Sequence, residues 1–206
     1  MVRLRKAQTT LRKAAKDIIS GASKSIDSLD PRQVEGMIDV FLDAKKKGRK
    51  IFILGMGRSG LVAKAFGLRL LHLGFNVYVL GETINPAARA GDVFVAISGS
   101  GVTNLVVSEA QLARRIGATV VAVTSHPDSP IGRNAHRVVV VKGRTKIARR
   151  RDYLLRQIMG EHEPLAPLGT MFEISCMIFL DSLIVELMDR LKLTEEDLRM
   201  RHATLE

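Results

Sequence analysis

The chain has 206 residues, of which 46% are hydrophobic and 26% are charged, the balance of a globular protein with enough length for one well-packed domain. The formal net charge of +11 favours anionic partners such as phosphorylated metabolites. Aromatic residues make up only 4%, and no helix-turn-helix, zinc-finger or RNA-recognition pattern occurs, so we expect no nucleic-acid partner.

The cysteine content and the apolar segments exclude further classes of protein. Cys176 is the only cysteine, which rules out an intrachain disulfide and a zinc ribbon, and its apolar neighbours predict a buried core residue. No apolar stretch reaches the length of a membrane span or resembles a signal peptide. We therefore expect a cytoplasmic protein without membrane contact.

The first part of the chain predicts two helices. Residues 3–29 carry apolar residues at the spacing of an amphipathic helix. Asp30 and Pro31 are typical of a helix start, and the second helix is expected to run to about Lys47. We expect residues 1–48 to form a helical hairpin ahead of the rest of the fold.

Five short runs rich in β-branched residues follow, and they are almost continuously apolar, as in parallel strands that are covered on both faces. They lie at residues 50–54, 76–80, 92–98, 118–124 and 136–141, with helices predicted between them at 59–73, 103–116 and 129–134. This alternation predicts an α/β fold over residues 49–141. The expected architecture is a three-layer α-β-α sandwich with a five-stranded parallel sheet in the order 2-1-3-4-5.

Residues 142–206 are expected to form a connecting loop and C-terminal helices, which complete a single domain over residues 1–206. The connection is long and basic, so we predict a short helix within it at 151–159.

An almost wholly apolar helix is predicted at 170–192, and Thr194 is expected to cap a short terminal helix after it. Thr170 and Glu173 have the spacing of a capping box at the start of the long helix. A carboxylate in the first turn of a helix can equally be a fixed general base, and nothing local decides between the two.

Two glycine- and hydroxyl-rich loops follow strands, GMGRSG at 55–60 after the first strand and SGSGVTN at 98–104 after the third. In the predicted order these strands are neighbours where the winding reverses, which is where open α/β sheets bind ligands. Glycines let the backbone approach an anion, and helix N-termini supply unpaired N–H groups. Hydroxyl donors come from Ser59, Ser98, Ser100 and Thr103. The two loops predict one shared phosphate pocket.

A dinucleotide site is the main competing interpretation. Gly55, Gly57 and Gly60 match the dinucleotide fingerprint, and Glu82 follows the second strand where a ribose-binding acid would stand. Such a site has no use for the hydroxyls of the second loop. The lysine of a Walker loop is also absent, so we expect no cleavage of a nucleoside triphosphate. A small phosphorylated ligand is therefore favoured, with a nicotinamide-dependent oxidoreductase as the weaker alternative.

SGSGVT after a strand resembles the phosphate-binding signature of the sugar isomerase (SIS) domain. GMGRSG, LHLGFNVYVLGET, GEHEPLAPLGTMFE and the terminal RHATLE together resemble the 6-phospho-3-hexuloisomerases of that superfamily, over nearly the whole chain. The resemblance implies an isomerase that interconverts D-arabino-hex-3-ulose 6-phosphate and D-fructose 6-phosphate through a cis-enediol, without a metal or organic cofactor. It also implies a homotetramer whose active sites use residues of neighbouring subunits.

The family pattern, carried onto this sequence, makes Glu173 the catalytic base, with His72 and His202 as acid–base helpers near the substrate. Read without the resemblance, Glu173 is a helix cap, His72 a cation at a helix end and His202 a surface residue. The expected substrate-binding residues are Gly57, Arg58, Ser59, Ser98, Gly99, Ser100, Gly101, Val102 and Thr103, besides Glu173 itself. Val102 departs from the polar residue that is frequent there in this family, and Arg58 can also be read as an exposed arginine of a turn.

Two further possibilities concern metals and binding without catalysis. The side chains of GEHE at 160–163 are adjacent rather than spaced to converge on one ion, so we expect no metal site. A sugar-phosphate-binding module that keeps the loops but leaves the carboxylate unused is the alternative to an enzyme. Glu173 separates the two, because a sensor has no need of a carboxylate at that place.

Overall fold

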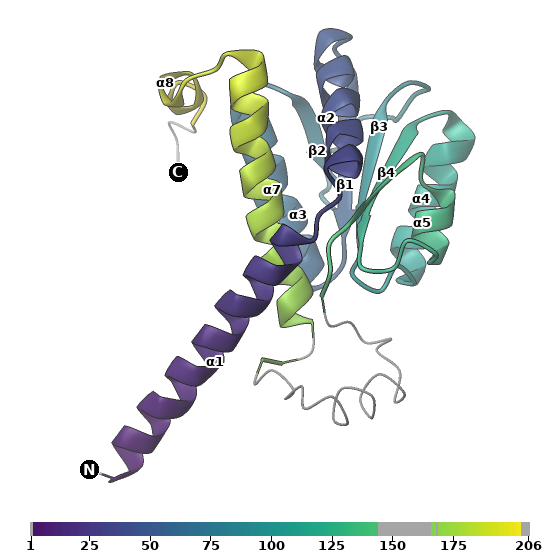
Figure 1. Cartoon of the computed structure of the whole chain (residues 1–206). Helices are drawn as coiled ribbons and strands as arrows, with labels where there is room; N and C mark the ends of the chain where they lie inside the picture. The colour runs from purple at the N-terminus through teal and green to yellow at the C-terminus, as the bar shows by residue number, and fades with distance from the viewer. Residues whose placement is uncertain (1, 144–165, 168, 203–206) are drawn as a thin grey trace.

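The computed structural model describes residues 2–143, 166–167 and 169–202, with side chains described from Thr9 onward. Five parallel strands form one sheet in the order β2-β1-β3-β4-β5 (Figure 1). The strands are β1 (Lys50–Gly55), β2 (Asn76–Val79), β3 (Val93–Ile97), β4 (Thr119–Thr124) and β5 (Arg137–Val140). The predicted sheet, its strand order and the approximate strand limits are confirmed.

Helices lie in three of the four intervals between strands, at the places predicted, and none lies among the described residues between β2 and β3. They are α1 (Val2–Asp27), α2 (Pro31–Lys46), α3 (Arg58–His72), α4 (Asn104–Ile116), α5 (Pro130–Asn134), α7 (Thr170–Leu191) and α8 (Glu195–Arg199). Asp30 caps α2, and Thr194 forms a capping box with Asp197 at the start of α8, as expected from their positions. The helix predicted at 151–159 lies outside the described residues.

The sheet is covered on both faces, which explains why its strands are continuously apolar. In β1, Ile51 and Ile53 face a core formed with α2, α3 and α7, whereas Phe52 and Leu54 face the core formed with α4 and α5. Cys176 belongs to the first of these cores and is fully buried, as predicted. The three layers are therefore helices, sheet and helices.

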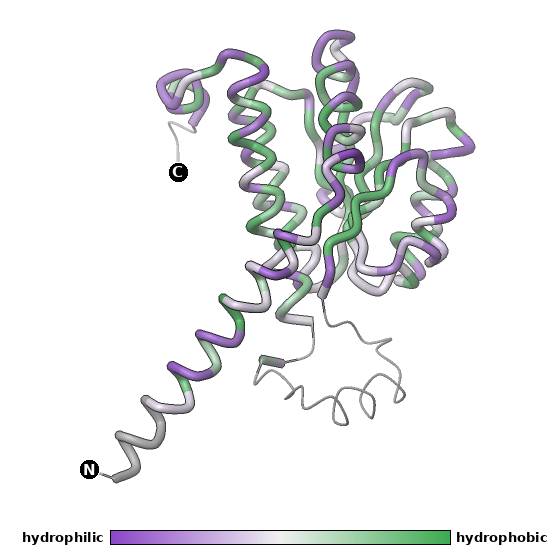
Figure 2. Tube along the Cα trace, viewed as in Figure 1, coloured by the Kyte–Doolittle hydropathy of each residue, from purple (hydrophilic) through white to green (hydrophobic). Residues whose placement is uncertain are grey.

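The two N-terminal helices are present, but α1 does not run back along α2. Figure 1 shows α1 projecting from the body of the fold, and its C-terminal half packs on α7. At that contact Gly21 leaves no room for a side chain, because a Cβ there would lie 2.3 Å from the Cε atom of Met171. Figure 2 shows α7 to be largely apolar, whereas polar residues recur along the projecting part of α1.

A buried carboxylate fixes the edge of the sheet at which the strands begin. Asp92 accepts hydrogen bonds from the backbone N–H groups of Lys50 at 3.0 Å and Arg89 at 2.8 Å, and its carboxylate lies 3.3 Å from the Lys50 ammonium. These contacts tie the starts of β1 and β3 together. None of the described helices combines the length and the apolar character that a membrane crossing requires.

Candidate functional site

The two predicted loops leave the sheet side by side. Strands β1 and β3 pair directly, with Gly55 opposite Ile97 at their carboxyl ends. The strand order reverses between these two strands, so the loops flank the crevice where ligands bind in this class of sheet. The predicted shared position of the two loops is confirmed.

The first loop is a tight turn that opens α3. A Cβ at Gly55 would lie 2.4 Å from the carbonyl oxygen of Ser59, so only glycine permits this turn. Gly57 is the N-cap of α3 with φ +57°, and a Cβ there would meet no atom within 4 Å. Arg58 and Ser59 therefore begin a helix whose N-terminus has open space in front of it, which suits an anion.

The second loop holds its hydroxyls in place through internal hydrogen bonds. The hydroxyls of Ser98 and Thr103 are 3.0 Å apart and hydrogen-bonded, and Ser98 Oγ also accepts from the N–H of Gly101 at 3.2 Å. Ser100 Oγ accepts from the N–H of Val102 at 3.4 Å. Thr103 is the N-cap of α4 but makes no side-chain cap bond there. The start of α4 is thus a second helix N-terminus beside the crevice.

The start of α7 is pressed against the second loop. A Cβ at Gly99 would lie 2.8 Å from the ring of Phe172, and a Cβ at Gly143 would lie 2.5 Å from the Cα of Phe172. Phe172 is buried between these two glycines. Because Glu173 is the next residue, this packing brings its carboxylate to the two loops.

Neither a capping box nor a cap by Thr170, the alternative in which Glu173 is left free to be the base, occurs among the described residues of this helix start. Gly169, with φ +97°, is the N-cap of α7, and Thr170 is the first helical residue with no side-chain cap bond recorded. A residue with positive φ takes the cap position at little cost only when it is glycine, which moves the cap one residue earlier than the threonine. Glu173 consequently does not reach back to a cap.

The Glu173 carboxylate is paired with a residue of the first loop instead. Arg58 donates from Nε to Oε2 of Glu173 in an ion pair between α3 and α7. The Glu173 side chain is only 14% exposed, whereas that of Arg58 is 62% exposed. The crevice therefore combines a shielded carboxylate, an accessible guanidinium, hydroxyls and two helix N-termini, which is suitable for binding a phosphate and moving a proton.

The two predicted histidines lie at the other end of α3. An α-helix rises about 1.5 Å per residue, so the 15 residues of α3 place His72 about 21 Å from Arg58. The His72 ring contacts that of His202, with ring centroids 4.0 Å apart and the ring planes tilted by 34°. Burial, together with the positive charges of His202 and Arg69, lowers the pKa of His72. Within one chain, neither histidine reaches Glu173.

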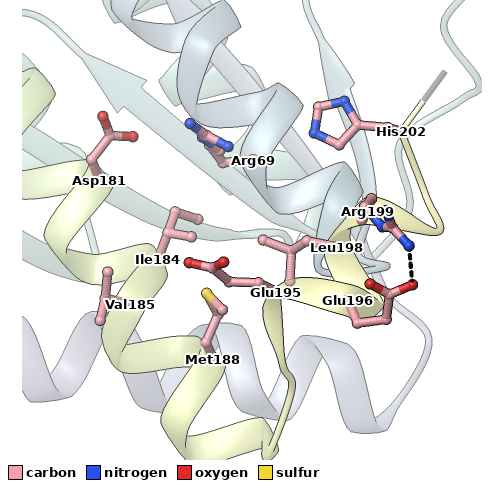
Figure 3. Close-up of a pocket in the computed structure, with 10 residues that line it drawn as sticks. All are labelled: Arg69, Asp181, Ile184, Val185, Met188, Glu195, Glu196, Leu198, Arg199 and His202. Atoms are coloured by element: carbon pink, nitrogen blue, oxygen red, sulfur yellow. Dashed lines mark hydrogen bonds and ion pairs between the residues drawn. The ribbon is translucent and has the colours of Figure 1, made fainter.

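His202 lines a cavity of about 610 Å³ between α3, α7 and α8 (Figure 3). The lining of the cavity includes the apolar side chains of Val185 and Met188 and the carboxylates of Asp181, Glu195 and Glu196. His72 is 3% exposed, and its Nδ1 has no hydrogen-bond partner within the part of the chain that the structure describes. The histidine pair thus belongs to a region remote from the crevice.

The residues that a dinucleotide site or a metal site would need are not available in the described part of the chain. Glu82, the candidate ribose ligand, is 2.6 Å from the Lys64 ammonium on the exposed side of α3, so its carboxylate is already paired. In the described ranges, no three histidine, cysteine, aspartate or glutamate side chains gather as metal ligands. The GEHE stretch at 160–163 lies outside those ranges.

Comparison with known proteins gives consistent matches. The SIS domain model matches residues 45–150. An uncharacterized protein of Aeropyrum pernix is 54% identical over 182 residues, which are 88% of this chain and 86% of that protein. A 3-hexulose-6-phosphate isomerase of Methylomonas aminofaciens is 36% identical over 172 residues, 84% of this chain and 89% of that protein.

Among solved structures, a protein of Methanococcus jannaschii with an inferred function of 3-hexulose-6-phosphate isomerase is similar at a TM-score of 0.73. Its sequence is 31% identical, and the match covers 95% of this chain and 98% of that one.

Proposed function

This chain belongs to the SIS domain family and is a sugar phosphate isomerase, and we propose that it interconverts D-arabino-hex-3-ulose 6-phosphate and D-fructose 6-phosphate. The observation that carries the proposal is the position of Glu173, a shielded carboxylate at the start of α7 that lies against both loops. The similarity of nearly the whole chain to proteins named for this reaction supports the same substrate pair.

The loops would hold the phosphate, and Glu173 would move the proton. Phosphate oxygens accept hydrogen bonds from the hydroxyls and helix N-termini that surround the crevice. Glu173 removes the proton on carbon 2 of the 3-ulose, which leaves a cis-enediolate across carbons 2 and 3. A proton passes from the oxygen on carbon 2 to the oxygen on carbon 3, and Glu173 returns its proton to carbon 3, so that the carbonyl ends at carbon 2 and no atom is gained or lost.

A second copy of the chain would supply the histidines. Exposed apolar side chains lie along α3 and α7, which pack on each other; they are Leu61, Leu68, Leu71, Ile178 and Val185. Both helices run from the Glu173 end of the fold to the His72 end. A partner related by a two-fold axis and packed antiparallel on this face would set its His72 and His202 beside Glu173 of the first copy. A tetramer contains two such pairs.

The reaction is tested by an assay on hex-3-ulose 6-phosphate, coupled to the detection of fructose 6-phosphate. We expect turnover by the wild type and a loss of about 1,000-fold or more in Glu173→Gln, because a carboxamide accepts no proton. Full activity of Glu173→Gln would contradict the base assignment. Binding of fructose 6-phosphate without turnover would instead favour a sensor, and stabilisation by a nicotinamide dinucleotide would favour the oxidoreductase.

A further inference from the structure

Arg58 is the side chain that contacts the proposed base directly. Its Nε donates to Oε2 of Glu173, which joins the first turn of α3 to the first turn of α7. We propose that Arg58 is a positioning residue, which fixes the orientation of the Glu173 carboxylate before the substrate arrives. This positioning role rests on the proposed reaction, in which Glu173 is the base.

The anchor of Arg58 is rigid although its side chain is exposed. Arg58 is the first residue of α3 and follows Gly57, whose positive φ sets the direction of the helix. The turn before it is tight, since a Cβ at Gly55 would lie 2.4 Å from the backbone oxygen of Ser59. The guanidinium therefore reaches across the crevice from a backbone with little freedom.

Gly169 leaves room for the other oxygen of the carboxylate. A Cβ at Gly169 would lie 3.2 Å from Oε1 of Glu173, so the absence of a side chain there gives this oxygen space while Oε2 is held by Arg58. A carboxylate held through one oxygen by a charged donor samples fewer orientations, which favours proton transfer because it depends strongly on geometry.

The ion pair also leaves donors available for the substrate. A guanidinium has five N–H donors, and the hydrogen bond to Glu173 uses the one on Nε. The terminal nitrogens can therefore face the oxygen that becomes negative in the enediolate, without releasing the base. Ion pairs with an exposed partner contribute only slightly to stability, by an amount that a double-mutant cycle can detect but that gives a structural role alone little weight.

The chain offers a matched control on the same helix. Lys64 pairs with Glu82 at 2.6 Å, and its side chain is 59% exposed, against 62% for Arg58. The two cations resemble each other in exposure and charge, whereas Glu82 is 55% exposed against 14% for Glu173, and the Lys64 pair lies away from the crevice. Lys64→Ala therefore measures how the loss of an exposed ion pair on α3, away from the crevice, affects stability and kcat.

The contact is tested first by thermal unfolding of four proteins: wild type, Arg58→Ala, Glu173→Gln and the double variant. If Arg58 acts on Glu173, its removal changes the unfolding midpoint less in the Glu173→Gln background than in the wild type. Equal changes in both backgrounds would overturn the contact. This readout does not depend on turnover of any substrate.

Kinetics on hex-3-ulose 6-phosphate then tests the positioning role. We expect Arg58→Ala to lower kcat by about 100-fold with KM changed by less than about threefold, as for a misplaced catalytic group. Guanidinium chloride should restore part of kcat in Arg58→Ala but not in Glu173→Gln, compared with potassium chloride at the same concentration. Arg58→Lys keeps the charge without the Nε donor and should have an intermediate kcat, whereas Lys64→Ala should retain wild-type kcat.

The possible negative results of these experiments distinguish the positioning role of Arg58 from the proposed reaction. A rise in KM alone for Arg58→Ala, without rescue by guanidinium, would overturn the positioning role and make Arg58 a phosphate ligand. An equal loss in Lys64→Ala would overturn it as well. An inactive wild type with a coupled unfolding cycle would reject the proposed reaction and leave the contact between Arg58 and Glu173 standing.

Discussion

The rings of His72 and His202 are in contact, with centroids 4.0 Å apart, at the end of α3 that lies opposite the ion pair of Arg58 and Glu173. The length of α3, about 21 Å between its ends, separates the histidines from the carboxylate within one chain. The proposed cooperation of these groups therefore depends on a second copy, and it can be tested by separating them between copies.

Hybrid oligomers provide that test. We expect Glu173→Gln and His72→Ala to be strongly impaired alone when assayed from fructose 6-phosphate. In a two-fold pair that contains one copy of each variant, one site receives both an intact Glu173 and an intact His72. Hybrids purified through two different affinity tags should thus recover about half of the wild-type activity. Activity no higher than the sum of the parent variants would contradict a shared site.

The proposed contact face gives a second, independent prediction. Leu68 is 53% exposed on α3, and a charge there cannot be buried against another copy without a large desolvation cost. Leu68→Glu should shift the protein to a smaller species in sedimentation at micromolar concentration and lower its activity. Leu112 is 42% exposed on α4 at the opposite face of the sheet, so Leu112→Glu serves as the control. A wild type that sediments as a monomer would contradict the prediction at once.

The direction of the reaction should reveal what the histidines do. With carbon 6 phosphorylated, hex-3-ulose 6-phosphate can close only strained small rings, so ring opening is needed only from fructose 6-phosphate. The equilibrium constant fixes the ratio of kcat/KM in the two directions, so the asymmetry must appear in kcat at saturating substrate. His72→Ala should lower kcat from fructose 6-phosphate on the order of 100-fold and change kcat from the 3-ulose much less. Equal losses in both directions would rule out ring opening as its role.

The conformation of the second loop depends on Gly101, and Gly48, which also has a positive φ but lies away from the loops, serves as the control. Gly101 has φ +66°, and a Cβ there would lie 2.0 Å from Ser129 Oγ. Gly101→Ala should lower the free energy of unfolding by about 2–4 kcal/mol and abolish stabilisation by fructose 6-phosphate. Gly48 has φ +60° with no atom within 4 Å of a Cβ, so Gly48→Ala should cost about 1 kcal/mol and leave ligand binding intact.

His136 should make the stability of the fold depend on pH. Its Nδ1 accepts a hydrogen bond from the N–H of Val120 at 2.9 Å, which only the neutral ring can do. Burial, together with the charges of Arg114 and Arg137, lowers the pKa of His136. The unfolded chain then binds a proton more readily than the folded one, so stability is full above about pH 6.5 and falls as the pH drops through the lowered pKa.

The measurement for His136 is the unfolding midpoint between pH 7.5 and 5. The midpoint of the wild type should fall on acidification, and the fall should be smaller in His136→Gln, which keeps an acceptor oxygen but does not titrate. Because His72 also has a lowered pKa and is present in both proteins, the difference between their two curves isolates His136. Parallel curves would contradict the prediction.

The layout of the sheet could be predicted from the sequence because it is encoded locally. Apolar runs such as residues 50–54 are long enough for strands, and glycines or polar residues mark their ends. The two loops could be predicted for the same reason, because glycines and hydroxyls at the ends of strands have few other uses. The residue that caps α7 could not be predicted from the sequence, because the positive φ of Gly169 depends on how Phe172 packs between Gly99 and Gly143.

Contacts between residues that are far apart in the chain could not be predicted from sequence patterns. Arg58 and Glu173 are 115 positions apart, and each has an ordinary local explanation as a turn arginine or a helix cap. The course of α1 is a similar case, because its apolar stripe predicts a helix but does not say which helix it packs on. Leu11 and Ile19 remain 69% and 68% exposed in one copy, so the stripe does not identify a partner within the chain.

The two loops belong to the sheet, whereas the carboxylate is carried by α7, which enters the crevice from a later part of the chain. In the proposed reaction, ligand binding and proton transfer are therefore carried by separate segments of the chain, which mutation can alter one at a time. Loss of Glu173 leaves every residue of both loops in place. On this proposal, a duplicated gene for this fold is one substitution away from encoding a receptor, and a receptor built on the same loops is one substitution away from regaining a proton acceptor.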